Sequence, residues 1–126
     1  MKIMVTGGNG FIGDTLVRHL LDGGNDVKVI DIKPIKFKHP KLEFVRKSVL
    51  EDIRWEMRDC EMVYHLAAEL GVVNSDKKPL ATLAVNIDGT VNVFRCALGT
   101  GVKKIVYTSS SEVYGEPREI PIKEES

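Results

Sequence analysis

The chain has 126 residues, of which 43% are hydrophobic, and its 18 Lys and Arg residues balance its 18 Asp and Glu residues. This length holds one compact domain with a hydrophobic core and little more. A balanced charge provides neither a basic field for nucleic acid nor an acidic tail, so a small-molecule site is the better starting hypothesis.

The cysteine content and the apolar runs bear on the protein's environment. Cys60 and Cys96 lie far apart without a CxxC pattern, so the sequence indicates neither a zinc site nor a disulfide framework. No apolar run reaches the roughly 18 residues that a transmembrane helix needs, and the start resembles a short strand rather than a signal peptide. We therefore expect a cytoplasmic protein without a metal, a membrane segment or a nucleic-acid partner.

Apolar runs alternate with helical patterns along the whole chain. In order, we predict a strand at 3–6, a helix over 12–21 ended by Gly23 and Gly24, a strand at 27–32, a basic loop at 33–41 and a strand at 42–45. There follow a weak helix over 50–58, a strand at 62–68, a helix over 80–98, a strand at 104–109 and an irregular loop at 116–121.

The helix over 80–98 is apolar on most of its sides, so we expect it to be buried on most of its sides. One face carries Leu83, Ala84, Ile87, Val91, Phe94 and Leu98, and the other carries Val85, Val93 and Ala97.

The order of the elements predicts an α/β fold, a Rossmann-type doubly wound parallel sheet of about five strands. Such a fold needs a helix after the fifth strand, and we predict none before Ser126. We therefore expect residues 1–126 to form an incomplete domain, truncated after the fifth strand. The uncovered long helix would then expose an apolar patch, which predicts a homo-oligomer or an unstable isolated chain.

A glycine-rich turn, Thr6 to Gly13, separates the first strand from the first helix. Read from Gly8 it is GxGxxG, and read from Gly7 it is GxxGxxG, the pattern that lets a pyrophosphate approach a helix N-terminus. Asp31 ends the second strand 18 residues beyond Gly13, near the spacing expected for a carboxylate that binds the adenosine ribose. A carboxylate there favours NAD over NADP.

Two observations on this turn leave alternatives open. Lys33 and Lys36 follow Asp31 and could neutralise a 2′-phosphate, which weakens the preference for NAD. Alternatively, the turn is merely tight, and Asp31 caps a loop.

Four motifs resemble the N-terminal part of the extended short-chain dehydrogenase/reductase family, the NAD-dependent sugar-nucleotide epimerases and dehydratases. They are TGGNGFIG at Thr6–Gly13, YHLAA at Tyr64–Ala68, NIDGT at Asn86–Thr90 and YTSSSEVYG at Tyr107–Gly115. Their order and spacing extend the resemblance over essentially the whole chain. It implies NAD as the cofactor and a nucleotide sugar as the substrate of the full-length enzyme.

The resemblance also implies roles in cofactor binding. Phe11 and Ile12 would contact the pyrophosphate through their backbone, and Asn86 would brace the active-site backbone and the cofactor ribose. Ser48–Val49 stands where the family has an acid and a branched residue over the adenine, with Asp52–Ile53 as the alternative. The expected set is Gly7, Gly10, Phe11, Ile12, Gly13, Asp31, Ser48, Val49, Leu66, Ala67, Ala68 and Asn86.

Alternative structural roles exist for two parts of this set. Ala67 and Ala68 could serve only to pack a helix against a strand. Asn86 could be a satisfied core amide, which is compatible with its implied role.

Two residues after the fifth strand are the expected catalytic positions. Ser110 matches the family's catalytic serine or threonine, which bonds a sugar oxygen. Glu112, within a run that resembles 4,6-dehydratases and UDP-glucuronate decarboxylases, would remove the C5 proton once C4 is oxidised, unless it is simply a solvated glutamate.

The family's tyrosine and lysine pair, spaced by four residues, is missing from the sequence. Tyr64, Tyr107 and Tyr114 are followed at that spacing by Ala68, Ser111 and Arg118. We therefore expect the catalytic helix and the substrate domain to be absent, so that the chain alone binds NAD without turnover. The alternative function is a non-catalytic dinucleotide-binding module, an NAD sensor or scaffold.

Overall fold

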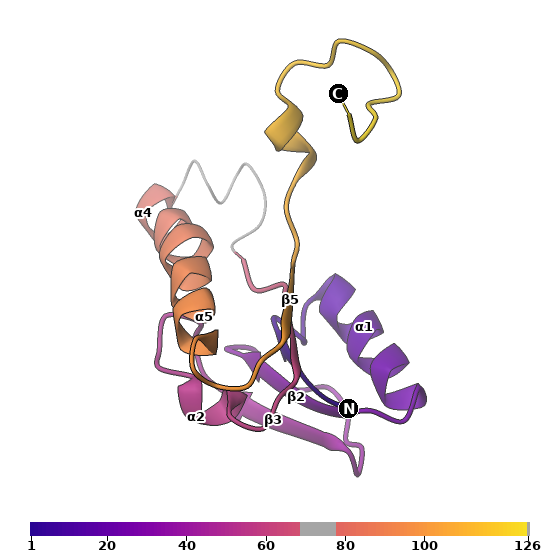
Figure 1. Ribbon diagram of the computed structural model, residues 1–126, viewed down its shortest axis with the longest axis vertical. Coiled ribbons are helices and arrows are strands. Elements are labelled where there is room, and N and C mark those ends of the chain that lie inside the picture. The colour runs from indigo at the N-terminus through magenta and orange to yellow at the C-terminus, as the bar shows by residue number, and fades with distance from the viewer. Residues whose placement is uncertain (69–77, 126) are drawn as a thin grey trace.

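The computed structural model describes residues 1–68 and 78–125 of the chain. Five strands form one parallel sheet in the order β3-β2-β1-β4-β5 (Figure 1). Their bounds are β1 Lys2–Thr6, β2 Asp26–Asp31, β3 Leu42–Arg46, β4 Met62–His65 and β5 Lys104–Tyr107. The order doubles back at β1, between β2 and β4, which confirms the predicted Rossmann-type sheet.

Helices cover both faces of this sheet. The helix α1 (Phe11–Asp22) lies on one face, and α2 (Arg54–Met57) and α5 (Gly89–Ala97) lie on the other (Figure 1). The central strands β1 and β2 are therefore buried on both sides, which accounts for their continuous apolar runs.

Each face has its own hydrophobic core. The α1 side consists of Ile3, Val5, Val17, Leu20, Leu21, Val27 and Val29. The opposite side consists of Met4, Ile30, Val49, Ile53, Met57, Cys60, Val63, Val93 and Cys96. Alternate residues of each central strand thus face opposite helices, as the pleat of a strand requires. Both cysteines are buried and free.

Several predicted elements are too long. The strand predicted to reach Ala68 ends at His65, because the N–H of Ala67 donates to the side chain of Thr6 instead of to a neighbouring strand. The strand predicted to reach Ser109 ends at Tyr107. The helix predicted over 50–58 is only the four-residue α2, because the hydroxyl of Ser48 accepts the N–H of Leu50 and holds a turn.

The long predicted helix is one continuous rod with a mixed backbone. It consists of α4 (Pro79–Leu83), a π-helical turn η1 (Ala84–Asp88) and α5. No helix among the described residues has the length and apolar character to cross a bilayer.

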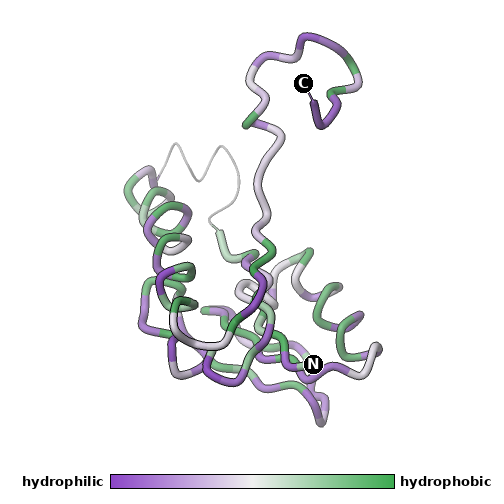
Figure 2. Tube along the Cα trace, viewed as in Figure 1, coloured by the Kyte–Doolittle hydropathy of each residue, from purple (hydrophilic) through white to green (hydrophobic). Residues whose placement is uncertain are grey.

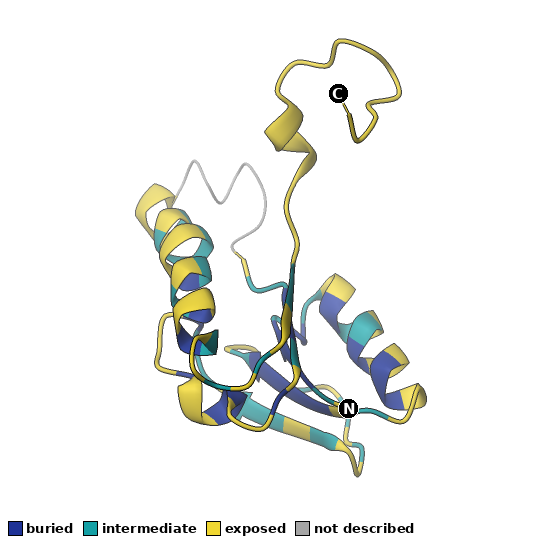
Figure 3. Cartoon of the chain, viewed as in Figure 1, coloured by how far each residue is buried: buried dark blue, intermediate teal, exposed yellow. Residues whose placement is uncertain are grey.

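The expectation that this rod is buried on most sides is wrong. Only Gly89, Val93 and Cys96 are buried, because a single side of the rod meets the sheet and α2 (Figure 3). Other apolar residues of the rod are exposed, and the rod contains green, hydrophobic stretches in Figure 2. This exposed stripe consists of Leu80, Leu83, Ile87, Val91, Phe94 and Leu98. An uncovered apolar patch on this helix was expected from the sequence.

Candidate functional site

A pocket of about 250 Å³ opens at the carboxyl edge of the sheet. Since all five strands are parallel, the turns after β1, β2, β3 and β4 meet along this edge. The lining residues are Gly7, Gly10, Ile30, Asp31, Ile32, Lys33, Lys47, Ser48, Val49, Leu66, Ala67, Ala68 and Val85. Eight residues of the expected cofactor-binding set are among them.

The glycine turn brings α1 close to the end of β1. Gly7 has a φ of 71°, and a Cβ there would lie 2.8 Å from the backbone N of Ala67, so no larger residue fits. A Cβ at Gly13 would overlap the carbonyl oxygen of Gly7. The N-cap residue Gly10 provides no side-chain bond to α1. The first turn of α1 is therefore open to an anion.

Asp31 stands at the end of β2 with both carboxylate oxygens engaged. Its Oδ2 accepts the backbone N–H of Asn9 at 2.9 Å, and its Oδ1 accepts the backbone N–H of Lys33 at 2.9 Å. The amide Nδ2 of Asn9 also donates to the carbonyl oxygen of Lys33 at 2.6 Å. The carboxylate is therefore fixed in the pocket wall.

After β3 the structure distinguishes the two placements of the adenine contact. Ser48 and Val49 line the pocket. Asp52 forms an exposed pair with Arg54, which lowers the pKa of its carboxyl to about 2, and the side chain of Ile53 is in the core. The geometry therefore favours the Ser48–Val49 placement.

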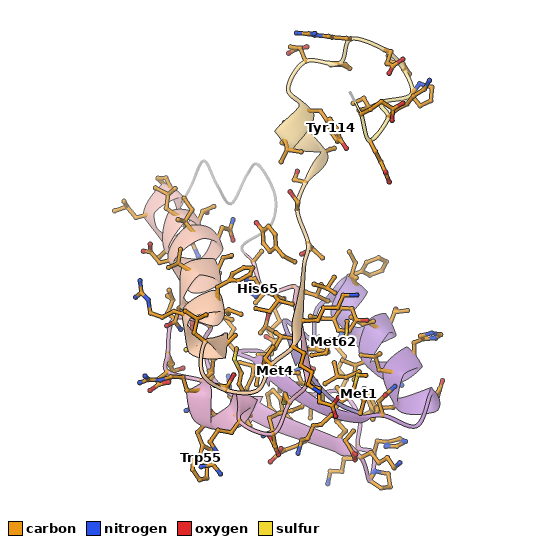
Figure 4. All side chains as sticks on the ribbon, in the orientation of Figure 1. Met1, Met4, Trp55, Met62, His65 and Tyr114 are labelled. Carbon is orange, nitrogen blue, oxygen red and sulfur yellow. The ribbon has the colours of Figure 1, made fainter. Side chains whose placement is uncertain are left out.

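His65, labelled in Figure 4, is the last residue of β4 and is 1% exposed. Its Nδ1 is 2.7 Å from the hydroxyl of Thr6, which also accepts the N–H groups of Leu66 at 3.1 Å and Ala67 at 3.2 Å. The hydroxyl thus has its proton available only for the imidazole. Nδ1 is the acceptor, and the proton of a neutral His65 resides on Nε2.

The other side of the ring reaches the rod. The Nε2 of His65 donates to the hydroxyl of Thr90 at 2.9 Å, and that hydroxyl donates to the carbonyl oxygen of Asn86 at 2.7 Å. Burial without a charged partner lowers the pKa of His65 from 6.5 to about 4. The chain of hydrogen bonds thus connects the pocket wall to η1 through a neutral imidazole.

Some predicted site residues lie outside the pocket lining. Phe11 and Ile12 are 94% and 65% exposed at the start of α1, and Asn86 is on η1, partly buried. Ser110 and Glu112 are exposed on a segment that extends away from the sheet, which Tyr114 marks in Figure 4. There the hydroxyl of Ser110 accepts the N–H of Glu112 at 3.1 Å and begins the 3-10 turn η2 (Ser111–Tyr114).

Other residues of the site escaped the sequence analysis. Lys47 and Val85 line the pocket, and nothing in their local pattern singles them out. Thr6 and His65 lie inside two of the family motifs, where a polar residue at the end of an apolar strand was the available signal. Thr90 lies inside a third motif, on α5, without such a signal. In the described parts of the chain, no cluster of His, Cys, Asp and Glu could hold a metal ion.

Comparisons with known proteins agree on one family. The profile of the NAD dependent epimerase/dehydratase family matches residues 3–126. The chain belongs to this family. UDP-glucuronic acid decarboxylase 1 of Arabidopsis thaliana is 38% identical in an alignment of 132 residues that covers 98% of this chain and 29% of that protein.

Solved structures of the epimerase/dehydratase type have the same fold. A UDP-N-acetylglucosamine 4-epimerase from Methanobrevibacter ruminantium M1, in complex with UDP-N-acetylmuramic acid, has a TM-score of 0.88 at 34% identity, covering 98% of this chain and 42% of that one. MoeE5, in complex with UDP-glucuronic acid and NAD, has a TM-score of 0.86 at 30% identity, and the match covers 93% of this chain and 39% of that one. The chain spans less than half the length of each of these relatives.

NAD is the cofactor of this family, and the pocket residues fit it. The first turn of α1, next to side-chain-free Gly7 and Gly10, suits a pyrophosphate. The Asp31 carboxylate keeps acceptor capacity for ribose hydroxyls, because each oxygen accepts one backbone N–H and has a second lone pair for another donor. Val49 and Val85 provide apolar surface for an aromatic ring.

The depressed pKa of His65 predicts a pH-dependent stability. The unfolded chain binds a proton below about pH 6.5, whereas the folded chain binds it only near pH 4. The free energy of unfolding should therefore fall by about 3 kcal/mol as the pH drops across this window. Urea denaturation between pH 7 and pH 4 measures it.

Two variants separate this effect from other titrations. His65→Gln should remove most of this pH dependence, and His19→Gln, at an exposed position of α1, should retain it. Identical pH profiles for all three proteins would contradict the assignment.

Proposed function

We propose that this chain is the cofactor domain of an NAD-dependent enzyme that modifies a nucleotide-linked sugar through transient oxidation at C4. The observation that carries the proposal is the pocket, which joins the glycine turn, the Asp31 carboxylate and the end of β4 at one edge of the sheet. Epimerisation, dehydration and decarboxylation all proceed through the same C4 ketone, so the domain serves each of them. The rest of the substrate site lies in the part of such enzymes that this chain does not match.

The residues take roles according to their position. Asp31 accepts hydrogen bonds from the adenosine ribose, and the backbone of Phe11 and Ile12 contacts the pyrophosphate. The apolar contact over the adenine comes from Val49, next to Ser48. The remaining cofactor contacts are Gly7, Gly10, Gly13, Leu66, Ala67, Ala68 and Asn86.

Ser110 and Glu112 follow β5 and act on the sugar. When bound, NAD would take the hydride from C4, and the proton of the C4 hydroxyl would go to the family's tyrosine base, for which residues 1–126 hold no tyrosine and lysine at the required spacing. Ser110 hydrogen-bonds the C4 oxygen, and Glu112 takes the proton from C5, which the neighbouring ketone makes acidic. Their exposure leaves both side chains open to a substrate.

We further propose that the protein works in the cytoplasm as a homo-oligomer. The apolar residues of the exposed stripe are spaced three or four positions apart in the sequence, so they lie along one side of the rod. A second copy of the chain packed against the exposed stripe would remove these side chains from water.

Asp31→Asn should weaken NAD binding about tenfold or more, because a charge-assisted pair of hydrogen bonds to the ribose is lost. It should also reduce the preference for NAD over NADP. Calorimetric titration of the chain with each nucleotide measures both effects. Asp22→Asn, at the exposed end of α1, is the control and should leave both constants unchanged. Equal affinity of the unsubstituted chain for NAD and NADP would contradict the role of Asp31.

The double variant Leu83→Glu/Ile87→Lys should convert the oligomer to a monomer, because it places charges in the centre of the exposed stripe. Sedimentation velocity at several concentrations measures the change. Val113→Lys, at a more exposed apolar position outside the stripe, should leave the oligomer intact. A monodisperse monomer of the unsubstituted chain with a sharp unfolding transition would rule out the oligomer.

A further inference from the structure

Asn9 is the one non-glycine residue between Gly7 and Gly10, and its side chain is nearly inaccessible, with the residue 4% exposed. Its amide Nδ2 donates to the carbonyl oxygen of Lys33 at 2.6 Å, across 24 positions of the sequence. A carbonyl oxygen only accepts hydrogen bonds, so the nitrogen of the amide must be the atom that faces it. The glycine turn is therefore tied by a side chain to the loop after β2.

This bond closes a ring of three hydrogen bonds. The backbone N–H of Asn9 donates to Oδ2 of Asp31, and the backbone N–H of Lys33 donates to Oδ1, both at 2.9 Å. The carboxylate cannot rotate without losing at least one of these bonds. The side chain of Asn9 bonds the carbonyl of Lys33 and thereby restrains the residue whose N–H donates to Asp31.

We propose that Asn9 is a specificity-determining residue that keeps the Asp31 carboxylate in place, so that the site accepts NAD and excludes NADP. The proposal rests on the proposed NAD-binding function of the pocket. Asn9 acts through Asp31 and does not itself need to touch the nucleotide.

The charge of the loop after β2 explains why the Asp31 carboxylate has to be held in place. A fixed carboxylate repels a 2′-phosphate, while it still accepts hydrogen bonds from a 2′-hydroxyl. The neighbouring loop carries Lys33, which lines the pocket, and Lys36, with no acidic residue between them. If Asp31 could turn away, these ammonium groups would neutralise the phosphate. By holding the Asp31 carboxylate in place, Asn9 thus keeps this locally basic region from binding NADP.

The test compares dissociation constants of NAD and NADP for the unsubstituted chain and for Asn9→Ala, by calorimetric titration. We expect the ratio of the two constants to move three- to tenfold toward NADP, about the effect of one lost hydrogen bond. The shift should come mainly from tighter NADP binding, with a smaller loss of NAD affinity.

Asn25→Ala is a matched control. Asn25 also uses its Nδ2 to bond a backbone carbonyl, that of Leu20 at 3.0 Å, but at the opposite end of α1. Its substitution should leave the NAD to NADP ratio unchanged. Asn9→Ser is a second variant, which retains a small polar side chain too short to reach the Lys33 carbonyl, and it should shift the ratio like Asn9→Ala.

A double-mutant cycle distinguishes action through Asp31 from a general structural role. If Asn9 works through the carboxylate, Asn9→Ala/Asp31→Asn should show the same ratio as Asp31→Asn alone. Additive shifts, or an unchanged ratio in both Asn9 variants while the chain still prefers NAD, would overturn the proposal. Failure of the unsubstituted chain to bind either nucleotide would instead refute the proposed function of the pocket.

Discussion

The hydroxyl of Thr6 is the contact on which the carboxyl edge of the sheet depends. It accepts two N–H groups from the segment after β4 and gives its proton to Nδ1 of His65. This places the wall of the pocket directly against the end of β1, where a side chain at Gly7 would not fit. The arrangement requires a neutral imidazole, because Nδ1 of His65 must accept the hydrogen bond from Thr6. Burial of His65 lowers its pKa and so favours the same neutral form. Removal of the hydroxyl would take this partner from the N–H of Ala67 and from Nδ1 of His65, while the N–H of Leu66 would keep the backbone carbonyl of Thr6 at 3.1 Å.

Much of the fold was predictable because it follows from repeating patterns. The apolar runs of the central strands, the glycine turn and Asp31 at the end of β2 each have a local signal in the sequence. Strand ends were not predictable, since β4 stops where the side chain of Thr6, 61 positions away, captures the N–H of Ala67. The N–H of Ala67 meets the hydroxyl of Thr6 only in the folded chain, so no local sequence pattern indicates this bond.

The site shows the same division between local and distant information. Asp31 was predictable from its spacing to the glycines, whereas the bond between Asn9 and Lys33 joins residues that no periodicity relates. The prediction that the long helix is buried on most sides was wrong. Apolar side chains on a helix indicate that the surface favours burial, but they do not show whether residues 1–126 contain a segment that packs against it. Only the side of α5 with Val93 and Cys96 meets a core in this structure.

The π-helical turn η1 couples two surfaces that otherwise have nothing in common. A π turn holds one residue more than an α-helical turn, and the step of the exposed stripe from Leu83 to Ile87 falls upon it. The same turn carries Val85 into the pocket lining and the Asn86 carbonyl toward Thr90. Because the wider turn takes up the additional residue, loss of a single residue here would restore a regular helix with little rotation of one end against the other. One turn of the rod thus serves both surfaces, so a change in the backbone of η1 would alter the pocket wall and the exposed stripe together.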